Sequence, residues 1–318
     1  MKHCKICHAE FKKPSLNVKE EMYGLGEIFQ YGQCTTCGCL QLLNIPDNLS
    51  EYYPKAYHGN ISPSLKRNWK TIRRGLKRKL ILEHPNWLSP LIKVCLSSIP
   101  LFWTYRKLGM QTKHKVLDVG SGYGGNTLEI QSAGIKQAIG VDLFIEQDIW
   151  VGDKLLVKKG TIDDLHDSYD IILFHHSLEH MPDQINTLKK SRALLHEGGK
   201  ILVRIPTVSS QAYLEYKEKW YQLDAPRHLF LHSHESFRRL AEAANLIILD
   251  KWCDSSELQF ITSEQYRRGI SSFDPKSYTI NKRTPIFTPQ EIREFKHKAN
   301  LANQSLAGDQ ICFVLGMV

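Results

Sequence analysis

Four of the eight cysteines fall into two pairs with the spacing of a metal site. Cys4 and Cys7 form one Cys-x-x-Cys pair, and Cys34 and Cys37 form a second. Two such turns can supply four thiolates to one tetrahedral Zn²⁺. Because four protein ligands leave no open position, the spacing predicts a structural zinc ribbon in residues 1–50. Gly38 follows the second pair, where such turns often need a positive φ.

Other uses of these cysteines stay open at this point. Cys39, His3 and His8 are spare donors, and free thiols or a redox-active pair are alternatives. The polar N-terminus lacks the apolar core of a signal peptide. Unpaired cysteines without a secretion signal are typical of a reducing compartment, so we expect a cytoplasmic protein. No uninterrupted apolar run approaches the ~18 residues of a spanning helix.

A glycine-rich loop is the second feature that could carry chemistry. Gly120, Gly122 and Gly125 match the dinucleotide fingerprint, and Asp142 follows where an acid could hold a ribose. Asp118, however, lies two residues before the first glycine. A carboxylate there suits a cationic ligand and opposes a pyrophosphate, which argues against an NAD-dependent dehydrogenase.

Alternating strands and helices must position this loop. We expect strands at 115–119, 138–142, 155–157, 169–174 and 200–205, and helices at 126–133 and 182–195. This alternation predicts an α/β fold with a mainly parallel sheet, whose ligands bind at the carboxyl ends of the strands. Two further strands, 246–252 and 311–317, flank an interruption at 255–308. We therefore divide the chain into 1–50, a basic and apolar helical segment at 51–110, and an α/β domain at 111–318 with an insertion at 255–308.

Three stretches resemble class I S-adenosylmethionine-dependent methyltransferases: Asp118 to Gly124, His176 to Asp183, and Ala193 to Pro206. The ribbon and Trp220 to His232 resemble the zinc-ribbon members found in bacterial cell-surface polysaccharide and deoxysugar biosynthesis. The similarity covers most of 1–253 and the last strand. It implies a Rossmann-like sheet with an antiparallel last strand and S-adenosylmethionine as cofactor.

The resemblance also implies cofactor-binding residues. Asp118 and the glycine loop would hold the methionine end, and Asp142 the ribose hydroxyls. Thr161 stands where relatives often have an acid for the adenine, so Asp163 is the candidate substitute. Solvated loop acids are the alternative at Asp142 and Asp163. The expected set is Asp118, Gly120, Ser121, Gly122, Asp142, Thr161, Ile162, Asp163 and His176.

Candidate catalytic residues follow two strands. A histidine near the position of His228 is the base in zinc-ribbon sugar C-methyltransferases, where it follows Tyr-Glu; here Pro226 and Arg227 precede it. We expect His228 to be the base and Arg227 to bind an anionic group of the acceptor; a structural loop anchor is the alternative. Glu179 and His180 are further catalytic candidates, or they stabilise their loop.

Two patterns near these residues need separate interpretation. His176 to His180 spell H-x-x-E-H, but this metalloprotease motif needs a helix, and here it leaves a strand. The insertion could cover a substrate, with Tyr266 as a sugar-binding candidate beside Gln259, Ser263 and Gln265. A lid or dimer contact without ligand is the alternative.

The charge is concentrated in one segment. The chain carries 42 Lys and Arg against 33 Asp and Glu, a net +9, and eight cations without an acid lie between Lys66 and Lys79. Leu65, Trp69, Ile72, Leu76 and Leu80 recur there at helical spacing. Residues 65–103 could rest on an anionic membrane surface or hold a nucleotide diphosphate. Packing of the apolar stripe on the α/β domain is the alternative.

These observations predict a methyltransferase that acts on a sugar nucleotide or glycan intermediate of cell-surface polysaccharide biosynthesis, in the cytoplasm or at the inner face of the membrane. An RNA methyltransferase would use the ribbon and basic helix to hold phosphates, although the loop after the fourth strand is Phe-His-His-Ser rather than Asn/Asp-Pro-Pro-Tyr. A non-enzymatic binding protein on the same fold is a third hypothesis.

Overall fold

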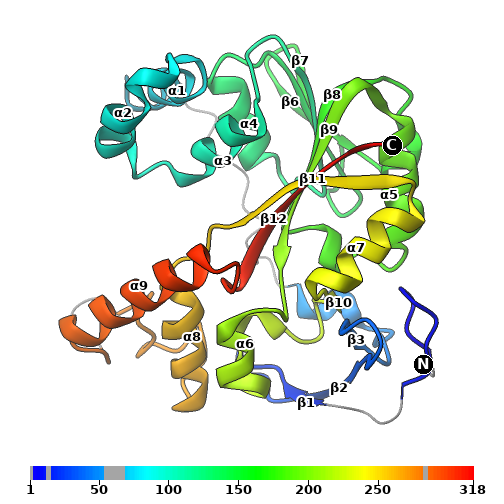
Figure 1. The fold of residues 1–318 in the computed structure, drawn as a ribbon, viewed down its shortest axis with the longest axis vertical. Coiled ribbons are helices and arrows are strands. Elements are labelled where there is room, and N and C mark those ends of the chain that lie inside the picture. Colours follow the sequence, from blue (N-terminus) through cyan, green and yellow to red (C-terminus); the bar gives the residue numbers. More distant parts are fainter. Residues whose placement is uncertain (1–2, 12–15, 54–68, 282–285) are drawn as a thin grey trace. The chain divides into compact units, whose positions relative to one another are not determined.

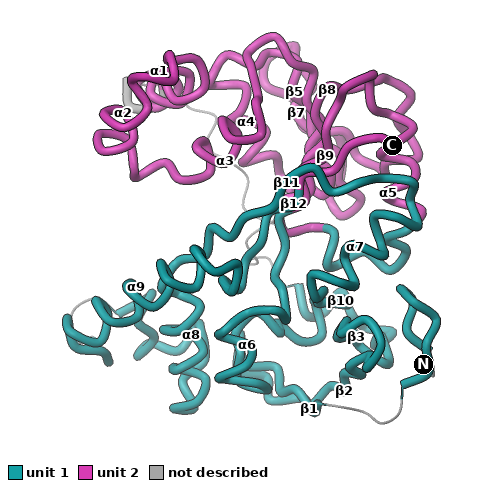
Figure 2. Tube along the Cα trace, viewed as in Figure 1, with its two compact units in different colours: residues 1–53, 178–185, 204–313 teal, residues 54–177, 186–203, 314–318 magenta. Residues whose placement is uncertain are grey.

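The computed structural model describes residues 3–11, 16–53, 69–281 and 286–318 (Figure 1). The chain divides into two compact units, each assembled from segments distant in sequence (Figure 2). Unit 1 comprises 1–53, 178–185 and 204–313, and unit 2 comprises 54–177, 186–203 and 314–318. The ribbon segment is therefore grouped with the C-terminal half of the chain, and the basic segment with the glycine loop.

Unit 2 carries three helices ahead of the central strands. These helices are α1 (Trp69–Glu83), α2 (Ser89–Leu96) and α3 (Pro100–Leu108). The strands and helices that follow are β4 (Lys115–Val119), α4 (Gly125–Ser132), β5 (Gln137–Asp142), β6 (Ile149–Val151), β7 (Lys154–Lys159), β8 (Tyr169–His175) and most of α5 (Gln184–Ala193). Two strands, β9 (Leu195–Pro206) and β12 (Gln310–Met317), belong partly to each unit.

The central sheet has the order β11-β12-β9-β8-β4-β5-β7-β6, with β11 spanning Leu246–Cys253. The β4–β5, β4–β8 and β5–β7 pairs are parallel, and the β6–β7 pair is antiparallel. From β4 the chain proceeds to β5 on one side and returns to β8 on the other. This reversal is the topological switch point at which such sheets bind ligands, and it places the loop after β4 there.

The predicted α/β class is confirmed, because the sheet is mostly parallel and has an antiparallel strand. Each predicted strand has a counterpart, since these strands are apolar runs that parallel sheets bury. The helix predicted to begin at Pro182 begins instead at Gln184. Strand β6 was not predicted, because three half-exposed or exposed residues give little hydrophobic pattern.

Unit 1 contains a four-stranded antiparallel sheet. Its strands, in order, are β1 (Leu16–Lys19), β2 (Ile28–Gln33), β3 (Leu40–Leu42) and β10 (Phe230–Leu231). The first three lie in the predicted ribbon, whereas β10 follows β9 in the chain and pairs with β3. The ribbon therefore does not form its sheet alone.

The rest of unit 1 includes α6 (Gln211–Tyr216), α7 (His234–Ala243), α8 (Leu258–Arg267) and α9 (Pro289–Gln304). Helices α8 and α9 both lie within the predicted insertion. Thr288 caps α9 and forms a capping box with Glu291, and Pro289 occupies the first turn. Phe260 of α8 stacks on Phe295 of α9 with ring centroids 6.3 Å apart, so the insertion has its own packed interior.

Candidate active site and cysteine cluster

The loop after β4 turns back onto the end of β5. Gly120 and Gly122 have φ of 72° and 53°, a left-handed conformation that favours glycine. The Gly120 amide donates to the Val141 carbonyl at 2.9 Å. The loop is thus fixed at the carboxyl ends of two neighbouring parallel strands, where the sequence places a ligand.

Asp142 is the acid at the end of β5. Its Oδ2 accepts from the Gly122 amide at 2.8 Å and its Oδ1 accepts from the Phe144 amide at 2.8 Å. A carboxylate oxygen has two lone pairs, so each can accept a further hydrogen bond. The two amides orient this half-buried carboxylate for a bidentate contact with neighbouring hydroxyls.

Asp118 is more enclosed than the sequence suggested. Its buried Oδ2 accepts from Asn126 Nδ2 at 2.9 Å and from Thr127 Oγ1 at 3.1 Å, so it anchors the first turn of α4. Burial raises the pKa of Asp118 to about 6, against the two hydrogen bonds, which lower it. Asn126 and Thr127 were not identified from the sequence, although both follow directly on the glycine loop.

Ser121 completes this cofactor cradle, by which we mean Asp118 to Gly122 and Asp142. Its Oγ is buried and has no hydrogen-bond partner within the described part of the chain. Gly140 of β5 makes room for it, because a Cβ at Gly140 would lie 2.2 Å from Ser121 Oγ. A polar ligand bound at this strand end can form the hydrogen bond that the Ser121 hydroxyl lacks.

The remaining predicted cofactor residues are Thr161, Ile162, Asp163 and His176, of which Thr161 and Asp163 make polar contacts within the protein. Thr161 caps the short helix η4 (Ile162–Asp164), and its amide donates to Asp164 Oδ2 at 2.7 Å. Asp163 forms an ion pair with Lys190, so its carboxylate already has a partner. Ile162 is buried, and His176, directly after β8, has a left-handed φ of 51°. Their contacts with a cofactor stay predictions.

In unit 1, Glu179 and His180 lie on the short helix η5 (Leu178–His180), and Asp224 and His228 on a loop after η7 (Tyr221–Leu223). We call these four residues the acid–base cluster. The ligand atoms of Glu179, His180 and His228 lie within 4.8 Å of one another, close enough to contact one cation.

His228 has a defined tautomer. Its Nδ1 is 2.7 Å from the Gln222 carbonyl oxygen, which can only accept, so Nδ1 carries the proton. Nε2 then has a free lone pair, 3.8 Å from Asp224 Oδ2 and 4.0 Å from Glu179 Oε1. Burial and the neighbouring His180 lower the pKa of His228 to about 4, although the carboxylates oppose this shift.

His180 is held in a similar way. Its Nδ1 is 2.8 Å from the Arg227 carbonyl oxygen, and its ring centroid is 4.8 Å from that of His228. The Glu179 side chain is fully buried, and the Glu179 carbonyl accepts from the Leu229 amide at 2.9 Å. The structure thus brings together three predicted catalytic residues, His228, Glu179 and His180.

Arg227 has a role different from the one expected. Its fully buried guanidinium donates to Asp224 Oδ1, to Glu20 Oε1 at 2.8 Å and to the Tyr52 carbonyl at 3.0 Å. Burial disfavours the charge, but the two carboxylates outweigh it and raise the pKa of Arg227. We therefore correct the prediction: Arg227 anchors the loop of His228 and is not exposed to an acceptor.

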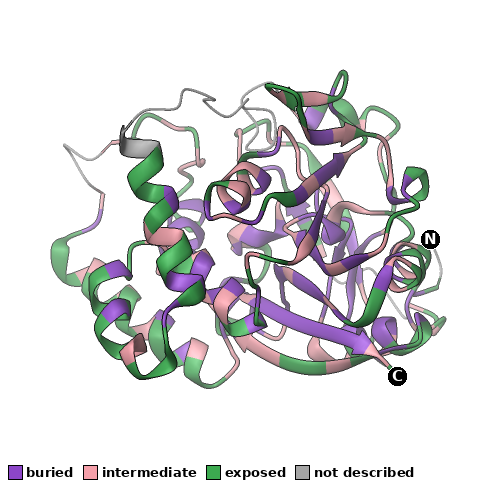
Figure 3. Ribbon diagram, turned by 90° about the horizontal axis from the view of Figure 1, so that it is seen from above, coloured by how far each residue is buried: buried purple, intermediate pink, exposed green. Residues whose placement is uncertain are grey.

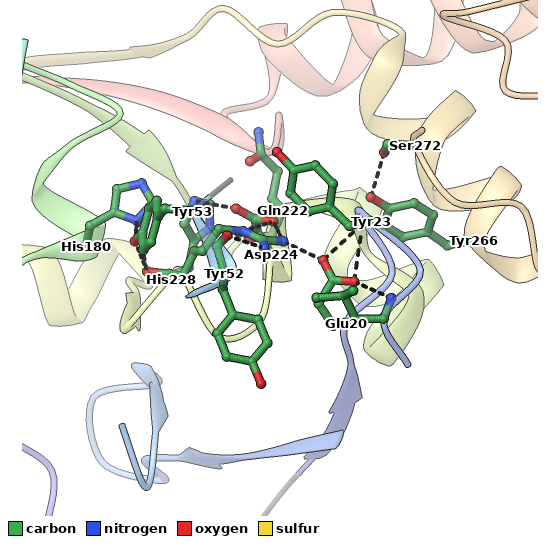
Figure 4. A network of polar contacts seen from close by, with 12 residues as sticks. Glu20, Tyr23, Tyr52, Tyr53, His180, Gln222, Asp224, His228, Tyr266 and Ser272 are labelled. Atoms are coloured by element: carbon green, nitrogen blue, oxygen red, sulfur yellow. Dashed lines mark hydrogen bonds and ion pairs between the residues drawn. The ribbon is translucent and has the colours of Figure 1, made fainter. Parts of the chain in front are cut away.

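Tyr266 is also enclosed. Its hydroxyl lies 2.7 Å from Ser272 Oγ, as Figure 4 shows, and its side chain is buried. The cavity beside it measures about 10 Å³, roughly enough for one water. The prediction that Tyr266 contacts a sugar is not supported in this structure, because the side chain packs inside the protein.

The four predicted cysteine ligands gather in unit 1. Cys4 Sγ lies 3.6 Å from Cys37 Sγ, and Cys7 Sγ lies 3.4 Å from Cys34 Sγ. Thiolates around a tetrahedral zinc at ~2.3 Å are roughly 3.7 Å apart, so the set fits this ion. Gln41 Nε2 donates to Cys4 Sγ at 2.9 Å and orients that ligand.

The spare donors lie outside this set. Cys39 is buried with its Sγ 4.0 Å from His232 Nδ1. His3 and His8 line a cavity of about 370 Å³ beside Cys4 and are absent from the group of four. His8 and Gly38 occupy equivalent positions in the two Cys turns, and both have positive φ.

A family model described as "Methyltransferase domain" matches residues 87–251, just over half of the chain. The chain belongs to this methyltransferase family. Together with the sheet order and the loop at its switch point, this makes it a class I S-adenosylmethionine-dependent methyltransferase, as predicted.

Individual relatives are distant. A ubiquinone biosynthesis O-methyltransferase of Aeromonas salmonicida is 23% identical over 172 residues, which cover 49% of this chain and 72% of the relative. A solved S-adenosylmethionine-dependent methyltransferase from Archaeoglobus fulgidus is 18% identical with a TM-score of 0.43, covering 70% of this chain and 93% of its own. An O-methyltransferase from a trans-AT polyketide synthase of Brevibacillus brevis, in complex with S-adenosyl-L-homocysteine, is 15% identical with a TM-score of 0.44. The match covers 76% of this chain and 79% of the Brevibacillus chain. These scores are too low to indicate an acceptor.

The cofactor cradle of this methyltransferase fits S-adenosylmethionine in its chemistry. Asp142 presents an oriented carboxylate suited to a ribose diol, and Ser121 has an unpaired buried hydroxyl. Asp118 adds an acid near the position expected for the cofactor's ammonium group. No phosphate has to be neutralised, which agrees with the two acids of the cradle.

Proposed function

We propose that this methyltransferase transfers a methyl group to a sugar nucleotide or glycan intermediate of cell-surface polysaccharide biosynthesis, with His228 as the general base. S-adenosylmethionine, when bound, supplies an electrophilic methyl group on a sulfonium. A hydroxyl or carbon acid of the acceptor must then lose a proton as it attacks. His228 Nε2 has a free lone pair because Nδ1 is fixed on the Gln222 carbonyl.

The surroundings of His228 support this role. Once it takes the proton, the imidazolium lies near the carboxylates of Asp224 and Glu179, which stabilise its positive charge. The backbone carbonyl on Nδ1 keeps the ring in one orientation, as a base needs. Arg227 and Tyr31 hold the same loop, since Tyr31 donates its hydroxyl to the His228 carbonyl at 2.8 Å.

The acceptor class has separate support. The ribbon and the segment Trp220 to His232 resemble methyltransferases of polysaccharide and deoxysugar pathways. The relative from Aeromonas salmonicida is an O-methyltransferase by name, in keeping with an acceptor that must lose a proton. Pro226 and Arg227 stand where the sugar C-methyltransferases have Tyr-Glu, so the resemblance to that branch is incomplete at the residues before His228.

The test is methyl transfer from isotopically labelled S-adenosylmethionine to a panel of nucleotide sugars, comparing wild type with His228→Asn. Asparagine keeps a donor for the Gln222 carbonyl and removes the base. We expect kcat to fall roughly 10²–10⁴-fold with the cofactor Kd unchanged. His297→Asn, at an exposed histidine, is the matched control and should leave kcat unchanged.

Two results would reject parts of this proposal. Wild-type kcat in His228→Asn, on any methylated acceptor, would reject His228 as the base. Methylation of a phenolic acceptor or RNA, without methylation of any nucleotide sugar or glycan, would reject the proposed acceptor class. The His228→Asn variant would then test the base on the acceptor that is methylated.

We also propose that the four cysteines hold a structural zinc ion. The cluster offers four thiol groups at suitable separations and a hydrogen bond to one of them. Metal analysis of the purified protein should find about one zinc per chain, and Cys34→Ser should lose it. A Cys39→Ser variant with unchanged zinc content is the control. Zinc retained in Cys34→Ser and lost in Cys39→Ser would show that the ligands are assigned wrongly.

A further inference from the structure

Helix α1 presents apolar side chains to solvent. Ile72, Leu76 and Leu80 are spaced four residues apart on one side of the helix and are all exposed, Leu76 by 63%. The opposite side faces protein: Ile81 and Leu82 are buried, and a Cβ at Gly75 would lie 2.4 Å from the Ser132 carbonyl oxygen. The described residues of the predicted stripe therefore face solvent and do not pack on the α/β domain. Leu65 lies outside the described residues, as do the side chains of Trp69 and Lys70.

The next helical segments add further exposed apolar groups. Trp87 is 78% exposed, and Leu91 and Val94 of α2 follow at 64% and 79%. Helix α2 buries Ile92 and Leu96 instead, so it has a protein-facing side and a solvent-facing apolar side. Figure 3 colours the ribbon by burial, and exposed residues alternate with intermediate and buried ones along the helices. Six large apolar side chains on consecutive helical segments exceed the scattered exposure that is normal for a surface.

Cations border this apolar row. On α1, Arg73 and Lys77 directly follow Ile72 and Leu76 in the sequence, and Lys79 flanks the row on its other edge. Lys93 lies between Leu91 and Val94 on α2. Between residues 72 and 96 the sequence has six Lys and Arg and one acid, Glu83. This α1–α2 surface is thus apolar along its centre and positive at its rim.

We propose that the α1–α2 surface docks this enzyme on an anionic lipid bilayer. An interfacial helix inserts its apolar side at the boundary between headgroups and acyl chains, while Lys and Arg pair with lipid phosphates, and Trp is favoured at that depth. The contact is peripheral: among the described residues, no helix is long and apolar enough to cross a membrane. The bilayer fits better than a second copy of the chain, because two positive rims would face each other.

Vesicle flotation tests this inference with the full chain. We expect binding to phosphatidylcholine vesicles that contain phosphatidylglycerol and much weaker binding to phosphatidylcholine alone. Arg73→Glu with Lys77→Glu should weaken binding, by roughly fivefold for each cation lost. Leu76→Ser with Leu91→Ser should weaken it at least as much. The controls are Lys154→Glu and Leu214→Ser, exposed residues elsewhere, which should bind as wild type.

Several outcomes would overturn the inference. One is no binding to anionic vesicles at low ionic strength. Another is a loss of vesicle binding in the control variants equal to that in the α1–α2 variants. A third is self-association that the serine variant abolishes, without any vesicle binding by the wild type. Salt-dependent affinity for a short RNA without vesicle binding would likewise assign the surface to nucleic acid. Methyltransferase activity on a soluble acceptor is a fold control, and it should be unchanged in all four variants. The result does not depend on the identity of the acceptor.

Discussion

His228 has a fixed tautomer and a lowered pKa. The Gln222 carbonyl fixes Nδ1 as the donor, and burial favours the neutral ring. The nearby carboxylates of Asp224 and Glu179 raise the pKa of His228, but by less than burial and His180 together lower it. With this pKa the imidazole stays unprotonated through the neutral range, which is the form that the proposed base requires.

The pH dependence of catalysis follows from this. Because the pKa of His228 is lowered to about 4, the base form persists well below the ordinary histidine value of about 6.5. With S-adenosylmethionine saturating, so that protonation of Asp118 near pH 6 does not limit cofactor binding, we expect kcat to change little between about pH 7.5 and 6 and to fall only as the pH approaches 4. A pH profile with an acidic limb near 6.5 would contradict this environment for His228.

Glu20 shows how a residue far away in sequence can position the loop that carries His228. It accepts from Arg227 and also from the amides of Tyr23 and Leu25, each at 3.0 Å. Glu20→Gln would leave the buried Arg227 with one carboxylate, which we expect to cost about 3 kcal/mol of unfolding free energy. It should also lower kcat, because Arg227 anchors the loop of His228.

The control for this variant is Glu21→Gln. Glu21 pairs with Lys219 at a partly exposed site, and such pairs contribute less than about 1 kcal/mol. Denaturant unfolding and steady-state kinetics on both variants provide the comparison. Equal stability losses in the two, or an unchanged kcat in a less stable Glu20→Gln, would argue against a positioning role for Glu20.

At the scale of elements, the link between β4 and α4 depends on close packing against β5. Gly140→Ala would place a Cβ 2.2 Å from Ser121 Oγ, so the serine must move. We expect a stability loss of about 1–3 kcal/mol and weaker cofactor binding. The double variant Ser121→Gly, Gly140→Ala should recover the stability. Calorimetry and thermal unfolding measure both effects.

Gly125→Ala is the control for this change, since a Cβ there would meet no atom within 4 Å and the residue begins α4. It should be neutral or slightly stabilising. If the Gly140→Ala protein were as stable as Gly125→Ala, the predicted clash between the new Cβ and Ser121 would be contradicted.

The elements that the sequence predicted well are those whose signals are local. The strand ending at Val119, the glycine loop and Asp142 lie within one short stretch, and the two cysteine pairs have fixed spacing. The contacts that were missed join distant positions: β10 pairs Phe230 with Gln41, and Glu20 binds Arg227. Hydrophobic periodicity carries no information on such pairings. The same limit explains Tyr266, whose enclosure depends on Ser272 and the fold of the insertion.

At the scale of the whole molecule, the cysteine cluster and the acid–base cluster both belong to unit 1, whereas the cofactor cradle belongs to unit 2. Removal of the proposed zinc by a strong chelator should therefore lower kcat and the Tm of unit 1, and change the cofactor Kd less. Tyr31 of the ribbon sheet, which contacts the His228 carbonyl, gives the physical link. Parallel loss of cofactor binding and kcat would contradict this division.

The most direct test of the central claim is isothermal titration calorimetry with S-adenosylmethionine. We predict binding to one site in the wild type, and a roughly 10- to 100-fold loss of affinity in Asp142→Ala, because charged hydrogen bonds to the ribose are removed. Asp153→Ala, at an exposed acid outside the cradle, should bind as the wild type does. No binding by the wild type, or unchanged affinity in Asp142→Ala, would contradict the assignment of the cofactor cradle.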